Sequence, residues 1–94
     1  MLYMVMCKDK PGKLEARMAK LDDHRTYVDN QPLKVVLSGP LVQEGGDMHG
    51  SLYVLEADEL AQVQHFADND PLAAADVWES VTVSAFNKRV GWNG

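Results

Sequence analysis

The chain has 94 residues, of which 46% are apolar and 24% are charged, and its formal net charge at pH 7 is −5. This length suits one folded domain over residues 1–94 and is too short for two independent hydrophobic cores. The acidic balance offers no surface that would release counterions from a phosphate backbone, so it argues against nucleic acids and anionic membranes as partners.

The amino-terminal segment predicts a buried strand. Residues 2–7 (LYMVMC) form a continuous apolar run, and Pro11-Gly12 then marks a turn. The segment lacks the basic start, long apolar stretch and cleavage site of a signal peptide, and no run approaches the roughly 20 apolar residues that span a bilayer. Cys7 is the single cysteine, so no disulfide can form within the chain. Together these features favour a reducing, cytoplasmic location.

Residues 13 to about 30 predict the first helix. Most of the charged residues there fall off one apolar stripe at helical spacing. The stripe consists of Leu14, Met18, Leu21, Tyr27 and Val28. Asn30-Gln31-Pro32 ends the helix, because a residue that precedes proline avoids helical geometry.

The middle of the chain predicts a hairpin of two strands. Residues 33–38 form the second strand, which Gly39-Pro40 stops, and residues 51–56 form the third. The connection between them contains Gly45-Gly46-Asp47, a typical turn sequence.

The remainder predicts one more helix and one more strand. Asp58 is a suitable N-cap for a helix over residues 59–67, and Asn69-Asp70-Pro71 breaks it. Residues 72–76 are expected to form a loop or short turn. Alternation over residues 77–86 then marks the final strand.

The predicted order is therefore β-α-β-β-α-β. With right-handed crossovers it gives an α+β, ferredoxin-like fold, a four-stranded antiparallel sheet with two helices on one face. A domain this small is marginally stable alone, so we expect a homodimer formed through the open sheet face. Trp78 and Trp92 are expected to pack at the sheet or dimer surface, with a loosely held tail as the alternative for Trp92.

His24 is the first candidate for chemistry. It lies three residues after Leu21 and four before Val28, so it points with the apolar stripe of the first helix. Such a histidine is either hydrogen-bonded in the core or presented into a cleft. An unperturbed imidazole has a pKa of about 6.5 and is well matched to proton transfer at neutral pH.

Two aspartates are candidates to partner this imidazole. Asp70 lies in the break before Pro71, where it either bonds turn backbone or orients His24 and stabilises its protonated form. Asp9 follows the first strand, where active-site carboxylates are often placed, and equally suits a solvated loop.

Arg17 and Ser38 are candidates to contact a substrate. Arg17 lies seven residues before His24 and could clamp an anionic oxygen, although surface ion pairing with Glu15 or Asp22 is the commoner role. Ser38 ends the second strand and could donate a hydrogen bond into a cleft, or cap backbone. The histidines and the cysteine have no metal-ligand spacing, and no glycine-rich phosphate loop is present, so we expect neither metal nor cofactor.

Several segments together resemble the YciI family. RMAKLDDHRTYV at 17–28 is similar to its Arg…His helix, and LSGPL at 37–41 to its strand-ending Gly-Pro. GSLYVLEA at 50–57 resembles its Gly-Ser strand, DNDPL at 68–72 its Asp-Pro motif, and VSAFNK at 83–88 its final strand. The resemblance spans nearly the whole chain in order, which makes it more specific than any single motif.

This resemblance implies a usually dimeric ferredoxin-like domain, similar to muconolactone isomerases, with a histidine/aspartate site and no cofactor. By motif position the histidine is His24 and the aspartate is Asp70, with Asp9 as the alternative partner. The resemblance also implies removal of HCl from a chlorinated hydroxyhydroquinone, with Arg17 or Ser38 steadying the substrate oxygens. The rival hypothesis is a non-catalytic dimeric domain that binds a small molecule or a protein.

Overall fold

The computed structural model describes residues 1–91. In chain order its elements are β1 (Leu2–Asp9), α1 (Leu14–Ala19), α2 (Leu21–Asn30), β2 (Lys34–Val42), β3 (Met48–Glu56), α3 (Leu60–Asp68), α4 (Pro71–Ala74) and β4 (Trp78–Phe86). Within this part of the chain, no helix is long and apolar enough to cross a membrane. Trp92 lies outside the described residues.

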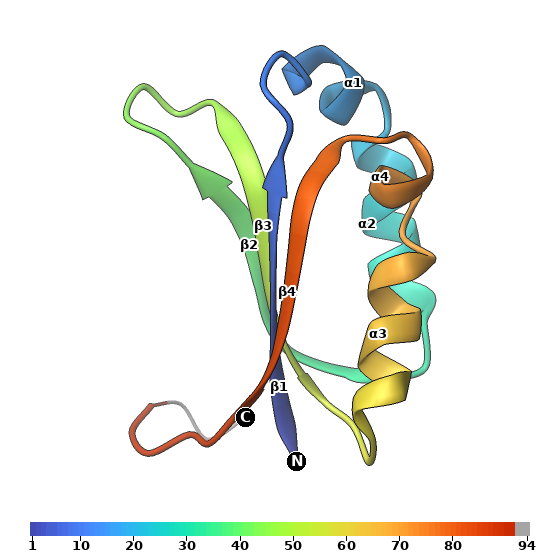
Figure 1. The fold of residues 1–94 in the computed structure, drawn as a ribbon, viewed down its shortest axis with the longest axis vertical. Helices are drawn as coiled ribbons and strands as arrows, with labels where there is room; N and C mark the ends of the chain where they lie inside the picture. The colour runs from blue at the N-terminus through green and yellow to red at the C-terminus, as the bar shows by residue number, and fades with distance from the viewer. Residues whose placement is uncertain (92–94) are drawn as a thin grey trace.

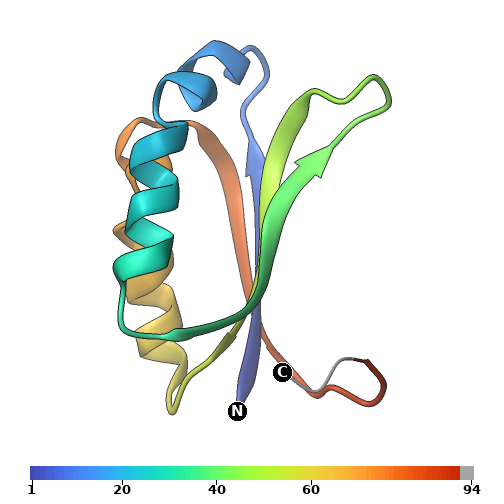
Figure 2. The same cartoon turned by 180° about the vertical axis from the view of Figure 1, so that it is seen from behind.

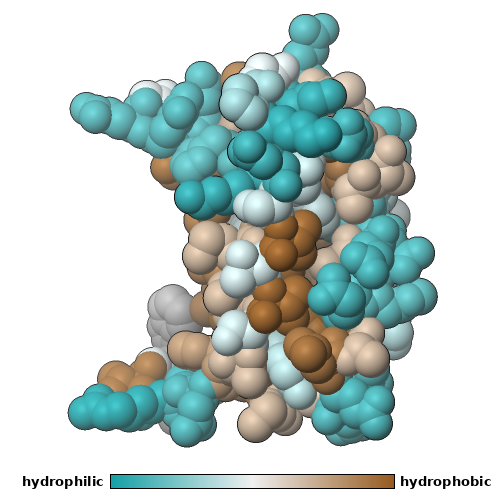
Figure 3. Space-filling model, viewed as in Figure 1, coloured by the Kyte–Doolittle hydropathy of each residue, from teal (hydrophilic) through white to brown (hydrophobic). Residues whose placement is uncertain are grey.

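The strands form one antiparallel sheet in the order β2-β3-β1-β4. The helices all lie on one side of it, as the two opposite views show (Figures 1 and 2). The predicted α+β ferredoxin-like fold is therefore confirmed. The view of Figure 3 shows that the other side of the sheet is hollowed between the β2–β3 turn and the segment after β4.

The core lies between the sheet and the helices. On the central strand β1, Tyr3, Val5 and Cys7 alternate with half-buried residues and are at most 7% exposed. Val5 is opposite Tyr53 on one neighbouring strand and Val83 on the other, so these side chains share the face that the helices cover. Trp78, expected to pack at the sheet or dimer surface, is buried in this core.

The predicted single helix over residues 13–30 is wrong, because the chain forms α1 and α2 with a break at Lys20. The helical stripe put Leu14 and Met18 inside, but both are exposed and Arg17 is buried instead. Arg17 is paired with Asp9 at the end of β1, and this ion pair ties α1 to the sheet.

The second strand continues through Gly39-Pro40 instead of stopping there. β2 is an edge strand, where a proline without an N–H can leave the ladder to its neighbour intact. β3 accordingly begins at Met48, which brings Gly50 into the sheet. A Cβ on Gly50 would clash with the carbonyl oxygen of Cys7, so only glycine fits at this crossing.

The second long helix, α3, begins one residue later than predicted. Glu59, not Asp58, is its N-cap, and Glu59 and Gln62 bond each other's backbone N–H groups in a capping box. The expected loop over residues 72–76 begins as the one-turn helix α4, with Pro71 at its first position.

Candidate active site

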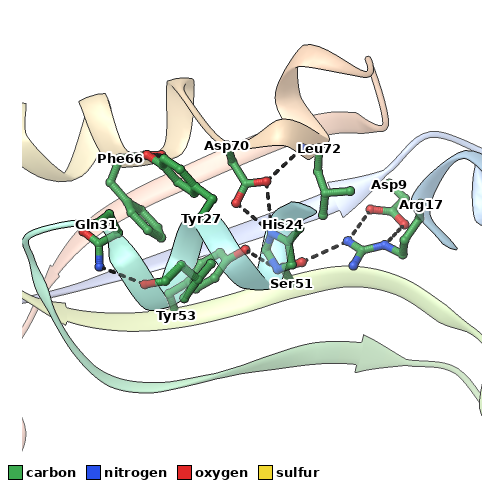
Figure 4. A network of polar contacts seen from close by, with 11 residues as sticks. Asp9, Arg17, His24, Tyr27, Gln31, Ser51, Tyr53, Phe66, Asp70 and Leu72 are labelled. Carbon is green, nitrogen blue, oxygen red and sulfur yellow. Dashed lines mark hydrogen bonds and ion pairs between the residues drawn. The ribbon is translucent and has the colours of Figure 1, made fainter. Parts of the chain in front are cut away.

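His24 and Asp70 form a direct pair between α2 and the start of α4 (Figure 4). The Nδ1 atom of His24 lies 2.8 Å from Oδ2 and 3.0 Å from Oδ1 of the carboxylate. A carboxylate accepts only, so Nδ1 carries a proton in both the neutral and the charged imidazole. This leaves Nε2 as the atom at which His24 gains or loses a proton.

The local fold holds Asp70 firmly in this position. Its side chain is fully buried and also accepts a hydrogen bond of 2.8 Å from the backbone N–H of Leu72, as the N-cap of α4. Pro71 at the first helical position fixes the turn. The side chain of His24 is 12% exposed, so the imidazole is oriented by a buried carboxylate while keeping some contact with solvent.

Tyr53 on β3 lies at the other side of the imidazole. Its hydroxyl is 3.4 Å from Nε2 of His24, a long and weak hydrogen bond in which the phenol donates. Burial, and then the charge of Asp70, raise the pKa of Tyr53 above its ordinary value, so the phenol stays neutral. We did not predict Tyr53 from the sequence, although it shares a strand face with Ser51 at a spacing of two.

Arg17 and Asp9 form a second buried pair. Nε and Nη2 of Arg17 donate to the two oxygens of Asp9 at 2.7 and 2.9 Å, and Nη2 also donates to Ser51 at 2.9 Å. Arg17 is 1% exposed. The structure therefore places Asp9 with Arg17 and places Asp70 with His24.

A cavity of about 310 Å³ opens in front of the imidazole. One wall is the stripe of α2 at helical spacing that consists of Leu21, His24, Arg25, Val28 and Asp29. The cavity lies within the size range of small-ligand sites, and His24 is one of the residues that line it.

The opposite wall of this cavity comes from the sheet. Ser38 on β2 pairs with Tyr53 on β3, and Pro40 pairs with Ser51, so these residues face the helices together. Arg17 also lines the cavity. Of the residues predicted to contact substrate, Arg17 and Ser38 are thus in the same cavity as His24, whereas Asp9 lies behind Arg17.

A larger groove of about 740 Å³ runs between α2 and α3, but it lacks a comparable pair. None of its lining residues is Asp, Glu, Lys or Arg. Its floor is the stacked pair Tyr27 and Phe66, and the hydroxyl of Tyr27 donates to the carbonyl of Phe66 at 2.8 Å. The paired histidine and carboxylate therefore single out the smaller cavity as the candidate site.

The other ionisable candidates are separate from this site. Burial raises the pKa of the Cys7 thiol to about 12, so it remains a small, protonated core residue. Over residues 1–91 no three His, Cys, Asp or Glu side chains are grouped as metal ligands would be.

Comparison with known proteins gives one family over most of the chain. The model of the YCII-related domain matches residues 1–87. Protein YciI from Escherichia coli O6:H1 is 31% identical over 94% of this chain and 98% of its own length, and Protein YciI from Shigella flexneri matches equally.

Solved structures agree with this assignment. 5-Chloro-2-hydroxyhydroquinone dehydrochlorinase (TftG) from Burkholderia phenoliruptrix AC1100, in complex with 2,5-dihydroxybenzoquinone, superposes with a TM-score of 0.86. It is 31% identical, and the match covers 93% of this chain and 94% of that one. A NIPSNAP domain protein from Burkholderia xenovorans, 16% identical with a TM-score of 0.56 over 99% and 98% of the two chains, shares the fold alone. The chain therefore belongs to the YCII-related (YciI-like) family.

Proposed function

We propose that this protein is a cofactor-independent lyase that eliminates HCl from a chlorinated hydroxyhydroquinone. The observation that carries the proposal is the His24–Asp70 pair at a cavity of about 310 Å³, with Nδ1 bound to the carboxylate and Nε2 left for proton transfer. The likeness to TftG, which is named for such a reaction, supports this choice of substrate.

The proposed reaction transfers one proton from a phenolic oxygen to a ring carbon and releases a second proton together with chloride. Nε2 of His24 takes a phenolic proton, and the electrons of that O–H bond move through the ring to the carbon that bears chlorine. The imidazolium returns the proton to this carbon. Chloride then leaves with its bonding electrons as a second hydroxyl loses its proton, which gives a hydroxyquinone. The overall change is loss of HCl with no external oxidant, so this scheme requires neither metal nor flavin.

The surrounding residues support this scheme in different ways. Asp70 stabilises the imidazolium that forms in the first step, because its buried carboxylate already faces Nδ1. We assign substrate contact to the hydroxyls of Ser38 and Tyr53. Arg17, whose Nε and Nη2 are held by Asp9, shapes the wall beside Ser51.

The test is release of chloride, and the ultraviolet change of quinone formation, from 5-chloro-2-hydroxyhydroquinone. We expect turnover by the wild type, a loss of about 10²–10⁴-fold in kcat for His24→Gln, and wild-type rates for His49→Gln. His49 is exposed on β3 and lies outside the cavity, so it is a matched control for a lost imidazole. Equal rates for wild type and His24→Gln, or no turnover by either, would favour the rival non-catalytic binding domain.

We also assign the helix-free face of the sheet to a homodimer contact. The register places apolar side chains from β1 and β3 together on this face. They are Leu2, Met4, Met6, Leu52 and Val54. Sedimentation should give a dimer for the wild type and a monomer for Met6→Glu; a wild-type monomer at micromolar concentration would contradict the assignment.

A further inference from the structure

Two guanidinium groups line the cavity, and they differ in whether a carboxylate pairs with them. Arg17 is buried and bonded through two nitrogens to the carboxylate of Asp9, so its charge is balanced within the protein. Arg25 is exposed at the same cavity and forms no ion pair within residues 1–91.

The position of Arg25 follows from the helix. It comes directly after His24 and lies four residues after Leu21 and four before Asp29, all on the cavity side of α2. Because an α-helix turns by about 100° per residue, neighbouring positions 24 and 25 flank one part of the cavity. A ring bound against Nε2 of His24 is therefore within the neighbourhood of a guanidinium.

The charges that face the cavity determine what this guanidinium can do. Asp70 is buried behind His24, and Asp29 lies one turn beyond Arg25 on the same wall. The charge of Arg17 is balanced by Asp9, so without Arg25 the charged groups around the cavity would be negative on balance. Arg25 is thus the one lining cation, within residues 1–91, that has no carboxylate partner.

We propose that the cavity selects rings that carry an ionised oxygen, a phenolate or the enolate of a hydroxyquinone, and that Arg25 binds this oxygen while His24 faces another ring substituent. This inference rests on the proposed function for the location of the site, and it adds the charge state of the substrate. Arg25 is a specificity-determining residue in this account, and neutral ether analogues of the same ring bind weakly.

The test compares two quinones of the same skeleton by titration calorimetry. 2,5-Dihydroxybenzoquinone is a vinylogous acid and is ionised at neutral pH, whereas 2,5-dimethoxy-1,4-benzoquinone cannot ionise. We expect Arg25→Gln to weaken binding of the dihydroxy compound about tenfold and to change binding of the dimethoxy compound less than twofold. Asp29→Asn should bind the dihydroxy compound at least as tightly as wild type.

Lys34→Gln is the matched control, because it removes one positive charge from an exposed site on β2 outside this cavity. It should bind both quinones as wild type does. The preference of wild type for the ionised ring should also decrease between 50 and 500 mM NaCl, since Arg25 is exposed and screened by salt.

Three results would overturn the inference: an equal loss for both quinones in Arg25→Gln, no loss for either, or no binding of the dihydroxy compound by wild type. These outcomes are distinct from failure of the proposed function. A protein that binds the ionised quinone through Arg25 but releases no chloride retains the inference and loses the lyase assignment. An Arg25→Gln protein that releases chloride with an unchanged KM retains the lyase assignment and loses the inference about Arg25.

Discussion

Replacement of Asp70 by asparagine changes the proton on His24 with little change in shape. Asparagine is a comparable N-cap, so its side-chain oxygen can still accept from the N–H of Leu72. Its NH2 group then faces Nδ1 of His24, in the place of the carboxylate oxygen that accepts from Nδ1 in the wild type. The imidazole satisfies this donor by moving its proton to Nε2, which removes the base from the cavity.

The expected magnitude follows from what the variant loses. A positioned general base contributes about 10²–10⁴-fold, so kcat for chloride release should decrease by that factor in Asp70→Asn. The free energy of unfolding should decrease by only about 1.5–3 kcal/mol, which is the contribution of one hydrogen bond to a charged group. The small stability loss separates a chemical role of Asp70 from a purely structural one.

The assay measures quinone formation at saturating substrate, with urea unfolding of the same preparation as the control for folding. We expect a folded variant with a strongly reduced kcat and a KM close to that of the wild type. A folded Asp70→Asn protein that keeps kcat within threefold of wild type would refute the assignment of Asp70 as the residue that orients His24.

Three further predictions concern the rest of the molecule. Arg17→Met should lower the free energy of unfolding by about 3–5 kcal/mol, because it leaves Asp9 as a buried carboxylate without its partner; a loss below 1 kcal/mol in urea unfolding would contradict this. Gly50→Ala should cost about 1–3 kcal/mol or prevent folding, since its Cβ meets backbone at Cys7, and an unchanged thermal midpoint would show that the strands can separate. Burial raises the pKa of the Cys7 thiol from 9.0 to about 12 in the folded protein. The unfolded chain therefore loses this proton at a lower pH than the folded protein does, so rising pH favours unfolding. Between pH 7 and 10 wild type should therefore lose about 1.4 kcal/mol more than Cys7→Ala, and parallel pH profiles from urea unfolding would contradict the burial of this thiol.

The sequence predicted the fold and the central pair for reasons that the structure explains. Apolar alternation and helical spacing are local properties, so the strands and the order of elements could be read directly. His24 was found because it shares a helical stripe with Leu21 and Val28. Asp70 was found beside Pro71 and through the family resemblance, but its distance to His24 depends on α4, a single turn whose position is set by tertiary packing.

The arrangement around Arg17 could not be predicted in the same way. The pairing with Asp9 depends on the break at Lys20, and no proline or glycine marks that break. Tyr53 and Arg25 were also missed, because a strand tyrosine and a surface arginine are ordinary until a cavity is known to lie between them. The second strand was predicted to end at Ser38, because Gly39-Pro40 is typical of a strand end. An edge strand such as β2 can contain a proline, so the strand continues to Val42.

The tautomer of His24 in the folded protein, measured by ¹⁵N NMR of histidine-labelled material, tests directly whether Nε2 can act as the base. We expect a proton on Nδ1 and a free electron pair on Nε2, with the Nε2 signal shifting when 2,5-dihydroxybenzoquinone is added. A proton on Nε2 with a bare Nδ1, or an Nε2 signal that stays unmoved as the quinone is added, would contradict it.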